Sequence, residues 1–250
     1  MTFFVQATAL AVLTVWSMLA SADDTRLYLF TNQYPPYNMT VDGTPYAHKA
    51  EDIEGMCTTI VKRMLANTSI DYTMKLRNWS FGLDRVERLK NHGIFCTIRS
   101  AEREHMFKWV GPITYMTGAL FARPDSEIKL KSVEDAKKYK IGGLKGDSFT
   151  NFFKDKGYNL SIVADDRENP YLLEQGTIDL WVSDVLTGPY KAADTTNMGE
   201  VKKVISFMKT PVYLAMNPET PDSIIKTLQK QIDLLRQSGA VQQIEAGFGI

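Results

Sequence analysis

One arginine stands where a charged side chain is well placed to bind an anion. The apolar run at residues 93–98, "GIFCTI", gives way to a polar segment in which Arg103 lies between two glutamates. The planar guanidinium group of arginine grips a carboxylate at two points, which a lysine does not do. A solvent-exposed charged turn is the alternative explanation. The segment therefore predicts an anion-binding site just after a strand, with Arg103 as the cation.

A serine after a glycine turn is the second candidate. In "LKGDSF", Ser148 stands at the expected start of a helix, where free backbone N–H groups and the serine hydroxyl can hold an anion. An ordinary helix cap is the alternative. A nucleophilic serine of the GDSL-esterase kind needs a histidine later in the chain. The three histidines, at positions 48, 92 and 105, all precede Ser148, which argues against a serine hydrolase.

An aspartate and three aromatic residues complete the candidate set. Asp184 ends the apolar run "IDLWVSD", at the sheet edge where open α/β proteins place ligand groups, and its carboxylate can pair with an ammonium group. Tyr34 and Tyr37 flank a rigid Pro-Pro pair after the first strand, and Trp79 begins a helix. Such rings can stack on a cation or an apolar ligand. The alternatives are a helix cap for Asp184 and simple packing for the aromatic rings.

Strands and helices alternate along most of the chain, which predicts an α/β fold with parallel sheets. The pattern predicts strands at residues 25–32, 70–76, 93–98, 119–124, 178–184, 203–207 and 210–217, and helices at residues 54–67, 79–91, 132–139, 169–176, 220–239 and 240–248. Within residues 140–158 it predicts a short strand, a glycine-rich turn and a helix that carries Phe149, Phe152 and Phe153. No new sheet follows the last two helices. They are therefore expected to return and pack on an existing unit, which makes the lobes discontinuous in sequence.

The first residues and the charge balance limit the classes of function. Residues 1–22 carry no charge and end in Ala-Ser-Ala, which predicts a cleaved secretory signal peptide; a membrane anchor is the alternative. The chain has 29 basic and 29 acidic residues, so no bulk charge attracts nucleic acid. We expect recognition by a local site, outside the cytoplasm.

The two cysteines, Cys57 and Cys96, are expected to form a disulfide in an oxidising compartment. Two buried free thiols are the alternative, because cysteine packs well in cores. A pair of cysteines without nearby histidines makes a poor zinc site, and no other metal site is predicted.

The order of these segments resembles the extracellular solute-binding proteins of family 3, which serve ABC importers of polar amino acids. The resemblance covers most of the chain after residue 22 and is carried by the segments "YPPYN", "GMCTTIVKRML", "WSFGLDRVERLKNHGIFCTIRSAERE", "FKWVGPITY", "IGGLKGDSF", "LLEQGTIDLWVSD" and "LLRQSGAVQQI". It implies a two-lobed α/β fold of the type II periplasmic binding kind. Residues 23–117 and 211–250 would form lobe 1 and residues 118–210 lobe 2, with two crossover strands and a cleft that closes on the ligand.

The resemblance also assigns roles by position. It implies that Arg103, with Thr97 and Ser148, binds the ligand carboxylate. Asp184 would accept the ammonium group, and the aromatic wall would consist of Tyr34, Tyr37 and Trp79. Two departures from the family pattern stand out. The segment before Arg103 is one residue longer than usual, which makes Arg99 a rival clamp, and Asp147 places an acid in the second-lobe turn.

We therefore expect a monomeric, periplasmic or secreted binding protein that captures a small polar ligand, such as an amino acid, for a membrane ABC permease. No enzymatic activity, cofactor, metal or nucleic acid is expected. Two alternatives remain open. One is an enzyme resembling the cyclohexadienyl dehydratases, with Glu174 or Asp147 as the general acid. The other is a receptor component that signals when the ligand is bound.

Overall fold

The computed structural model describes residues 26–250. The predicted signal peptide, residues 1–22, lies outside the described residues. The elements, in chain order, are β1 Leu27–Thr31, β2 Met39–Thr40, η1 Ala50–Asp52, β3 Ile53–Glu54, α1 Met56–Ala66, β4 Tyr72–Leu76, α2 Trp79–Arg88, β5 His92–Ile98, β6 Lys108–Ala122, η2 Val133–Lys138, β7 Ile141–Leu144, α3 Ser148–Lys154, β8 Leu160–Val163, α4 Glu168–Glu174, β9 Leu180–Asp184, α5 Thr187–Thr195, β10 Lys202–Met216, α6 Asp222–Gln237 and α7 Ala240–Gly247.

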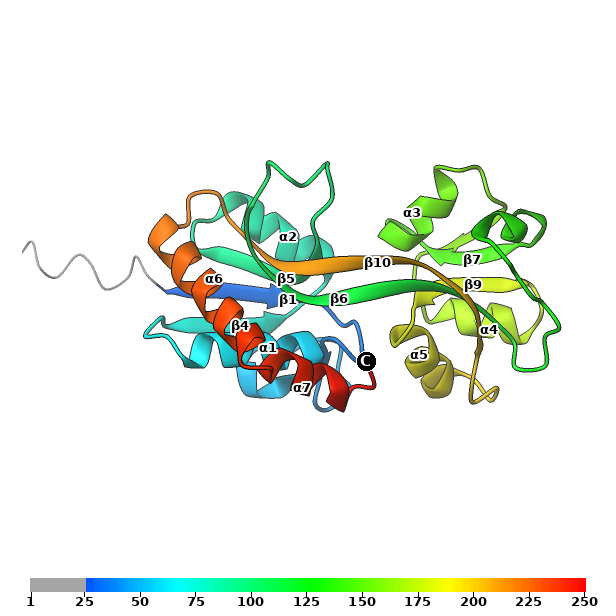
Figure 1. The fold of residues 1–250 in the computed structure, drawn as a ribbon, viewed down its shortest axis with the longest axis horizontal. Helices are drawn as coiled ribbons and strands as arrows, with labels where there is room; N and C mark the ends of the chain where they lie inside the picture. The colour runs from blue at the N-terminus through cyan, green and yellow to red at the C-terminus, as the bar shows by residue number, and fades with distance from the viewer. Residues whose placement is uncertain (1–25) are drawn as a thin grey trace, which may run out of the picture.

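One mixed sheet runs through the whole molecule, in the strand order β4-β1-β5-β10-β6-β9-β7-β8. Strands β4, β1 and β5 are parallel to one another, and so are β8, β7 and β9. The long strands β6 and β10 pair with each other in antiparallel register and connect the two parallel sets (Figure 1). We call the elements around β1, β4 and β5 lobe 1 and those around β7, β8 and β9 lobe 2.

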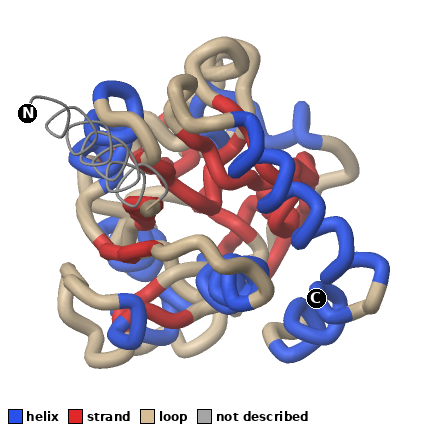
Figure 2. The backbone as a smooth tube through the Cα atoms, turned by 90° about the vertical axis from the view of Figure 1, so that its left-hand side faces the viewer, coloured by secondary structure: helices blue, strands red, loops and turns tan. Residues whose placement is uncertain are grey.

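Helices cover both faces of the sheet in lobe 1, which the alternation along β1 explains. Leu27 and Leu29 join the core that includes α1 and α6, whereas Phe30 faces the opposite side and packs with Val86 of α2. The two C-terminal helices lie beside α1 at the lobe 1 end of the molecule (Figure 1). Seen from that end, the strands run through the middle of the molecule and the helices surround them (Figure 2).

Lobe 2 repeats this arrangement on a smaller scale. Trp181 of β9 is fully buried between α4 and α5, and Leu180 faces the other side with Phe149 and Phe153 of α3. Two of its elements were not predicted. Strand β8 has only four residues and lies at the sheet edge, where the apolar Ile162 is exposed, so burial does not follow its apolar residues. Helix α5 carries a glycine and a proline in its first turn, which are poor guides to a helix.

The lengths of β6 and β10 correct the sequence prediction. Residues 119–124 were expected to form a separate strand, and residues 203–207 and 210–217 two more, but they belong to two strands of 15 residues each. Prolines at positions 112 and 211 and register shifts along β10 hide this continuity in the sequence, because prolines normally mark strand ends. The predicted lobe boundaries at residues 117/118 and 210/211 fall inside these strands and stay predictions.

The disulfide between Cys57 and Cys96 is confirmed, with the two Cα atoms 6.1 Å apart. It joins the start of α1 to β5, and both residues are buried. Among residues 26–250, no helix is long and apolar enough to cross a membrane.

Removing the disulfide should destabilise the protein. The bond closes a loop with a sequence separation of 39 residues. By the chain-entropy estimate, a loop of this size contributes roughly 3 to 4 kcal/mol to the free energy of unfolding. We expect the double variant Cys57→Ala/Cys96→Ala to lose about that much in urea unfolding monitored by circular dichroism. A reductant should destabilise the wild type and leave the double variant unchanged; equal stability of the oxidised wild type and the variant would contradict the prediction.

Candidate functional site

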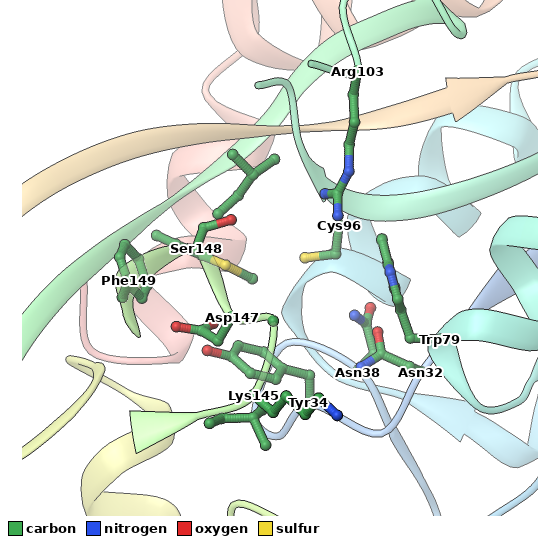
Figure 3. A pocket seen from close by; sticks show the side chains of 14 residues that line it. Asn32, Tyr34, Asn38, Trp79, Cys96, Arg103, Lys145, Asp147, Ser148 and Phe149 are labelled. Carbon is green, nitrogen blue, oxygen red and sulfur yellow. The ribbon is translucent and has the colours of Figure 1, made fainter. Parts of the chain in front are cut away.

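A cavity of about 210 Å³ lies between the two lobes. Its walls come from the loops that follow β1, β4, β5 and β7, and Figure 3 shows the side chains that line it. The lining residues are Asn32, Tyr34, Asn38, Trp79, Cys96, Ile98, Arg103, Met116, Leu144, Lys145, Gly146, Asp147, Ser148 and Phe149. The cavity therefore joins positions that lie more than a hundred residues apart in the sequence.

Strand direction explains why these residues meet. Strand β5 is antiparallel to β10, and β9 is antiparallel to β6, so the parallel strands of each lobe point toward the other lobe. The loops at their carboxyl ends consequently face each other across the gap, the place where open α/β sheets bind ligands. Helix α2 begins with Trp79 just after β4, and the turn after β7 carries residues 145–149.

Backbone hydrogen bonds from the start of α1 fix the loop that carries Tyr34. The backbone N–H groups of Met56 and Cys57 donate hydrogen bonds to the carbonyl oxygens of Pro36 (3.0 Å) and Tyr37 (2.9 Å). This close approach requires a glycine at position 55. Gly55 has a φ of 110°, and a Cβ atom on it would lie only 2.5 Å from the backbone oxygen of Tyr37. The helix thus fixes the position of the loop.

The structure separates the two candidate arginines. Arg103 lines the cavity with its guanidinium group 5.4 Å from the centre of the Trp79 ring, and no carboxylate of residues 26–250 forms an ion pair with it. Arg99 is exposed and forms a two-point ion pair with Glu104, one bond of which measures 2.6 Å. Arg99 is thus already neutralised outside the cavity, whereas Arg103 is available to a ligand.

The second-lobe wall carries an acid without a cationic partner. Asp147 caps α3 by accepting a 2.9 Å hydrogen bond from the Thr150 backbone N–H, and no Lys or Arg of residues 26–250 pairs with it. Burial raises the pKa of Asp147 to about 6, and the negative charge of Asp166 adds to the rise. Ser148 and Phe149 line the cavity beside it.

Asp184 and Tyr37 lie outside the cavity lining. Asp184 is fully buried and accepts hydrogen bonds from the backbone N–H groups of Thr117 (2.7 Å), Leu186 (2.8 Å) and Thr187 (3.3 Å). The buried Tyr37 hydroxyl of lobe 1 donates a fourth bond at 3.0 Å. Burial raises the pKa of Asp184, and these donors oppose the rise. In this structure its carboxylate joins the lobes.

Thr97 also points away from the cavity. It is fully buried, and its hydroxyl donates a 3.1 Å hydrogen bond to the Ile94 carbonyl oxygen. Its neighbours Cys96 and Ile98 do line the cavity, as expected when side chains alternate between the faces of a strand. Of the seven predicted site residues, the structure therefore brings four together around the cavity, namely Tyr34, Trp79, Arg103 and Ser148. The binding roles of all seven stay predictions.

Sequence reasoning missed two asparagines in the first-lobe wall, Asn32 and Asn38. Asn38 is fully buried; its Oδ1 accepts a 3.2 Å bond from the Thr58 hydroxyl, and its Nδ2 has no hydrogen-bond partner among the described residues. The wall therefore contains a buried amide donor that no group of the described residues satisfies. Both residues stand beside the Tyr-Pro-Pro-Tyr run, so their proximity to it was the available signal.

A buried ion pair supports the aromatic wall from lobe 2. The Lys191 ammonium group lies 2.6 Å from Asp166 Oδ2 and 5.4 Å from the centre of the Tyr34 ring. Asn169 and Trp181 donate to the other Asp166 oxygen at 2.9 and 3.3 Å. Asp166 is thus neutralised by its own lobe, and Lys191 makes a second contact between the lobes. Within residues 26–250, no group of three or more His, Cys, Asp or Glu side chains could hold a metal ion.

The sequence matches no protein-family model and no curated protein. Many solved structures share the fold. A histidine kinase sensor domain with similarity to periplasmic binding proteins aligns with 90% of this chain and 96% of its own, with a TM-score of 0.75 and 17% identity. An ancestral arginine-binding protein bound to arginine aligns with 90% of this chain and 99% of its own, with a TM-score of 0.72 and 17% identity.

An ancestral amino acid-binding protein described as a precursor of cyclohexadienyl dehydratase aligns with 95% of this chain and 98% of its own. Its TM-score is 0.71 and its sequence identity 14%. These likenesses show the fold, and the predicted two-lobed α/β fold of the type II periplasmic binding kind is confirmed.

The bond between Tyr37 and Asp184 should contribute to stability. A hydrogen bond to a charged group contributes roughly 1.5 to 3 kcal/mol, so Tyr37→Phe should lower the free energy of unfolding by about that amount. Tyr34→Phe is the matched control, because no hydrogen bond of its hydroxyl is found within residues 26–250. Urea unfolding of the two variants measures the difference. Equal losses in both would show that the Asp184 bond adds nothing.

Proposed function

We propose that this protein is an extracytoplasmic solute-binding protein that captures a small, polar, carboxylate-bearing ligand, such as an amino acid, between its lobes. The observation that carries this proposal is Arg103, a guanidinium group on the cavity wall with an aromatic ring beside it and no carboxylate paired with it. An anion that enters the cavity is the natural counter-ion for this group, and its two oxygens match the guanidinium fork.

The size and walls of the cavity favour a small molecule held by both lobes. A volume of about 210 Å³ suits a ligand of a few heavy atoms and is too small for a polymer. Arg103 comes from lobe 1 and Ser148 from lobe 2, so a ligand that touches both is enclosed when the lobes approach. Enclosure excludes water and strengthens the attraction between the carboxylate and Arg103.

The similar structures support this proposal, because the ancestral arginine-binding protein holds its ligand on the same fold. We further propose that residues 1–22 direct the chain out of the cytoplasm. There the monomeric, ligand-bound form would be recognised by a membrane ABC permease. The sensor domain among the similar structures is the reason to keep a signalling partner as the alternative recipient.

Catalysis is the second candidate, favoured by the likeness to a dehydratase precursor. A dehydratase needs a general acid in the cavity. Glu174 lies outside the lining, where it accepts a 3.1 Å bond from the Asn197 backbone N–H, so Asp147 is the acid in position for this role. We propose binding without turnover; dehydration of a cyclohexadienyl carboxylate by the purified protein would favour the enzyme.

Arg103 should be essential for ligand binding. A thermal-shift screen of the twenty amino acids and small carboxylates should identify a ligand that raises the melting temperature. Removing one partner of an enclosed charge pair costs about 2 to 5 kcal/mol, so Arg103→Ala should weaken binding by roughly 30-fold or more. Isothermal titration calorimetry measures this loss.

Arg99→Ala is the matched control, because Arg99 is paired with Glu104 outside the cavity. It should retain the wild-type affinity within about threefold. If Arg103→Ala binds as well as the wild type while Arg99→Ala does not, the clamp is Arg99. If no carboxylate stabilises the protein but an amine or a sugar does, the proposed function is wrong.

A further inference from the structure

We propose that the ligand is a zwitterion whose ammonium group is bound by Asp147, so that the ligand spans the cavity from Arg103 in lobe 1 to Asp147 in lobe 2. This inference rests on the proposed function and deepens it. It assigns the acceptor of the ammonium group to a residue other than Asp184, which the resemblance to solute-binding proteins implied for this role.

Asp184 is poorly placed to receive a ligand. Its two carboxylate oxygens already accept four hydrogen bonds from within the protein, and the residue is fully buried outside the cavity lining. A carboxylate has about four lone-pair positions, so little acceptor capacity remains. A ligand could reach it only by breaking the Tyr37 bond and leaving that buried hydroxyl without its partner.

Asp147 has the opposite properties. It lines the cavity and is partly accessible, and its Oδ2 accepts the hydrogen bond from the Thr150 backbone N–H. In Figure 3, Asp147 lies near Tyr34 on the lobe 2 wall, and Arg103 enters the cavity from the other lobe. No cation of residues 26–250 pairs with it, and Arg103 itself lies beyond ion-pair distance. An acid in such a confined place is stabilised when a cation binds beside it.

The other charged groups around Asp147 do not replace this cation. Lys191, the cation beside Tyr34, is held by Asp166 at 2.6 Å, and Asp184 is enclosed by its own donors. Lys145, two residues before Asp147, also lines the cavity but forms no ion pair with Asp147. Arg103 and Asp147 thus remain as an unpaired cation and an unpaired anion on opposite walls. One zwitterion between them satisfies both charges.

The aromatic rings fit the same ligand. Tyr34 and Trp79 line the cavity on the lobe 1 side, and each ring already lies near one cation of the protein, Lys191 and Arg103 respectively. An ammonium group is attracted to the face of an aromatic ring. The ligand class is therefore an amino acid or a closely related amino carboxylate, and a carboxylate without an amine should bind less well.

The test compares each L-amino acid except proline with the 2-hydroxy acid that has the same side chain, by thermal shift and then calorimetry. The wild type should bind the preferred amino acid roughly 30-fold or more tightly than its hydroxy acid. Asp147→Asn and Asp147→Ser should reduce this ratio to about threefold or less. Both replacements retain a helix-capping side chain, so the fold should be preserved.

The dependence on pH provides a second readout. Asp147 must be ionised to bind the ammonium group, and its pKa in the free protein is raised to about 6 by burial. Affinity for the amino acid should therefore rise by up to about tenfold per pH unit as pH increases toward 6 and level off above it. Tyr34, which lies near Asp147, does not titrate in this range, because burial raises the pKa of its hydroxyl well above the usual value. The slope should disappear in Asp147→Asn.

Several outcomes would overturn the inference. If the Asp147 variants keep the amine preference and Asp184→Asn loses it, Asp184 is the ammonium acceptor. If amino and hydroxy acids bind the wild type equally, the amine is not recognised, although the proposed capture of a carboxylate stands. If neither class binds, the proposed function fails together with this inference.

Discussion

The antiparallel pairing of β6 with β10 is the constraint on which the rest of the molecule depends. These strands carry one sheet through both lobes, and because β5 and β9 are antiparallel to β10 and β6 respectively, the strands of each lobe point toward the other lobe. The loops at the carboxyl ends of the strands of one lobe therefore face those of the other lobe across one gap (Figure 1). Parallel strands place their functional loops at a single edge, and here two such edges enclose one cavity. The position of the site follows from strand direction before any side chain is considered.

Burial divides the acids of this region into two kinds. Asp184 and Asp166 are held by several donors each, and these bonds compensate for the loss of water around the charge. Asp147 is different, because the Thr150 amide satisfies part of its capacity and no cation accompanies it. The same contrast separates Arg99, which is paired, from Arg103, which is not. Charged groups that the protein leaves unpaired in a cavity are the ones that a ligand can satisfy, which is why the proposed binding mode uses Arg103 and Asp147.

The fold class, most elements and the disulfide could be predicted from the sequence, because apolar periodicity and turn residues report local structure. Four residues that line the cavity, Tyr34, Trp79, Arg103 and Ser148, could be predicted because each lies three to five residues after the end of a strand. The others show what a single sequence does not report. Thr97 points to the wrong face because side chains alternate along β5, and a shift of one residue decides between Thr97 and its neighbours. The saturation of Asp184 depends on Tyr37 and Thr117, which are far away in sequence. Asn38 becomes notable only because its amide lacks a partner in three dimensions.

The contacts between the lobes also bear on how binding changes the protein. Tyr37 reaches Asp184 and Lys191 lies against the Tyr34 ring, and neither contact requires a ligand. The arrangement of the lobes seen here therefore has stabilising contacts of its own. Arg103 and Asp147 destabilise this arrangement, because both lose hydration in the cavity and neither gains an ion-pair partner. A ligand shifts the balance between lobe arrangements only through its difference in affinity for them. A ligand that pairs with both groups removes this destabilisation, whereas one that pairs with Arg103 alone leaves the acid uncompensated. In the proposed binding mode, the closing of the cleft and the choice of ligand thus depend on the same two charges.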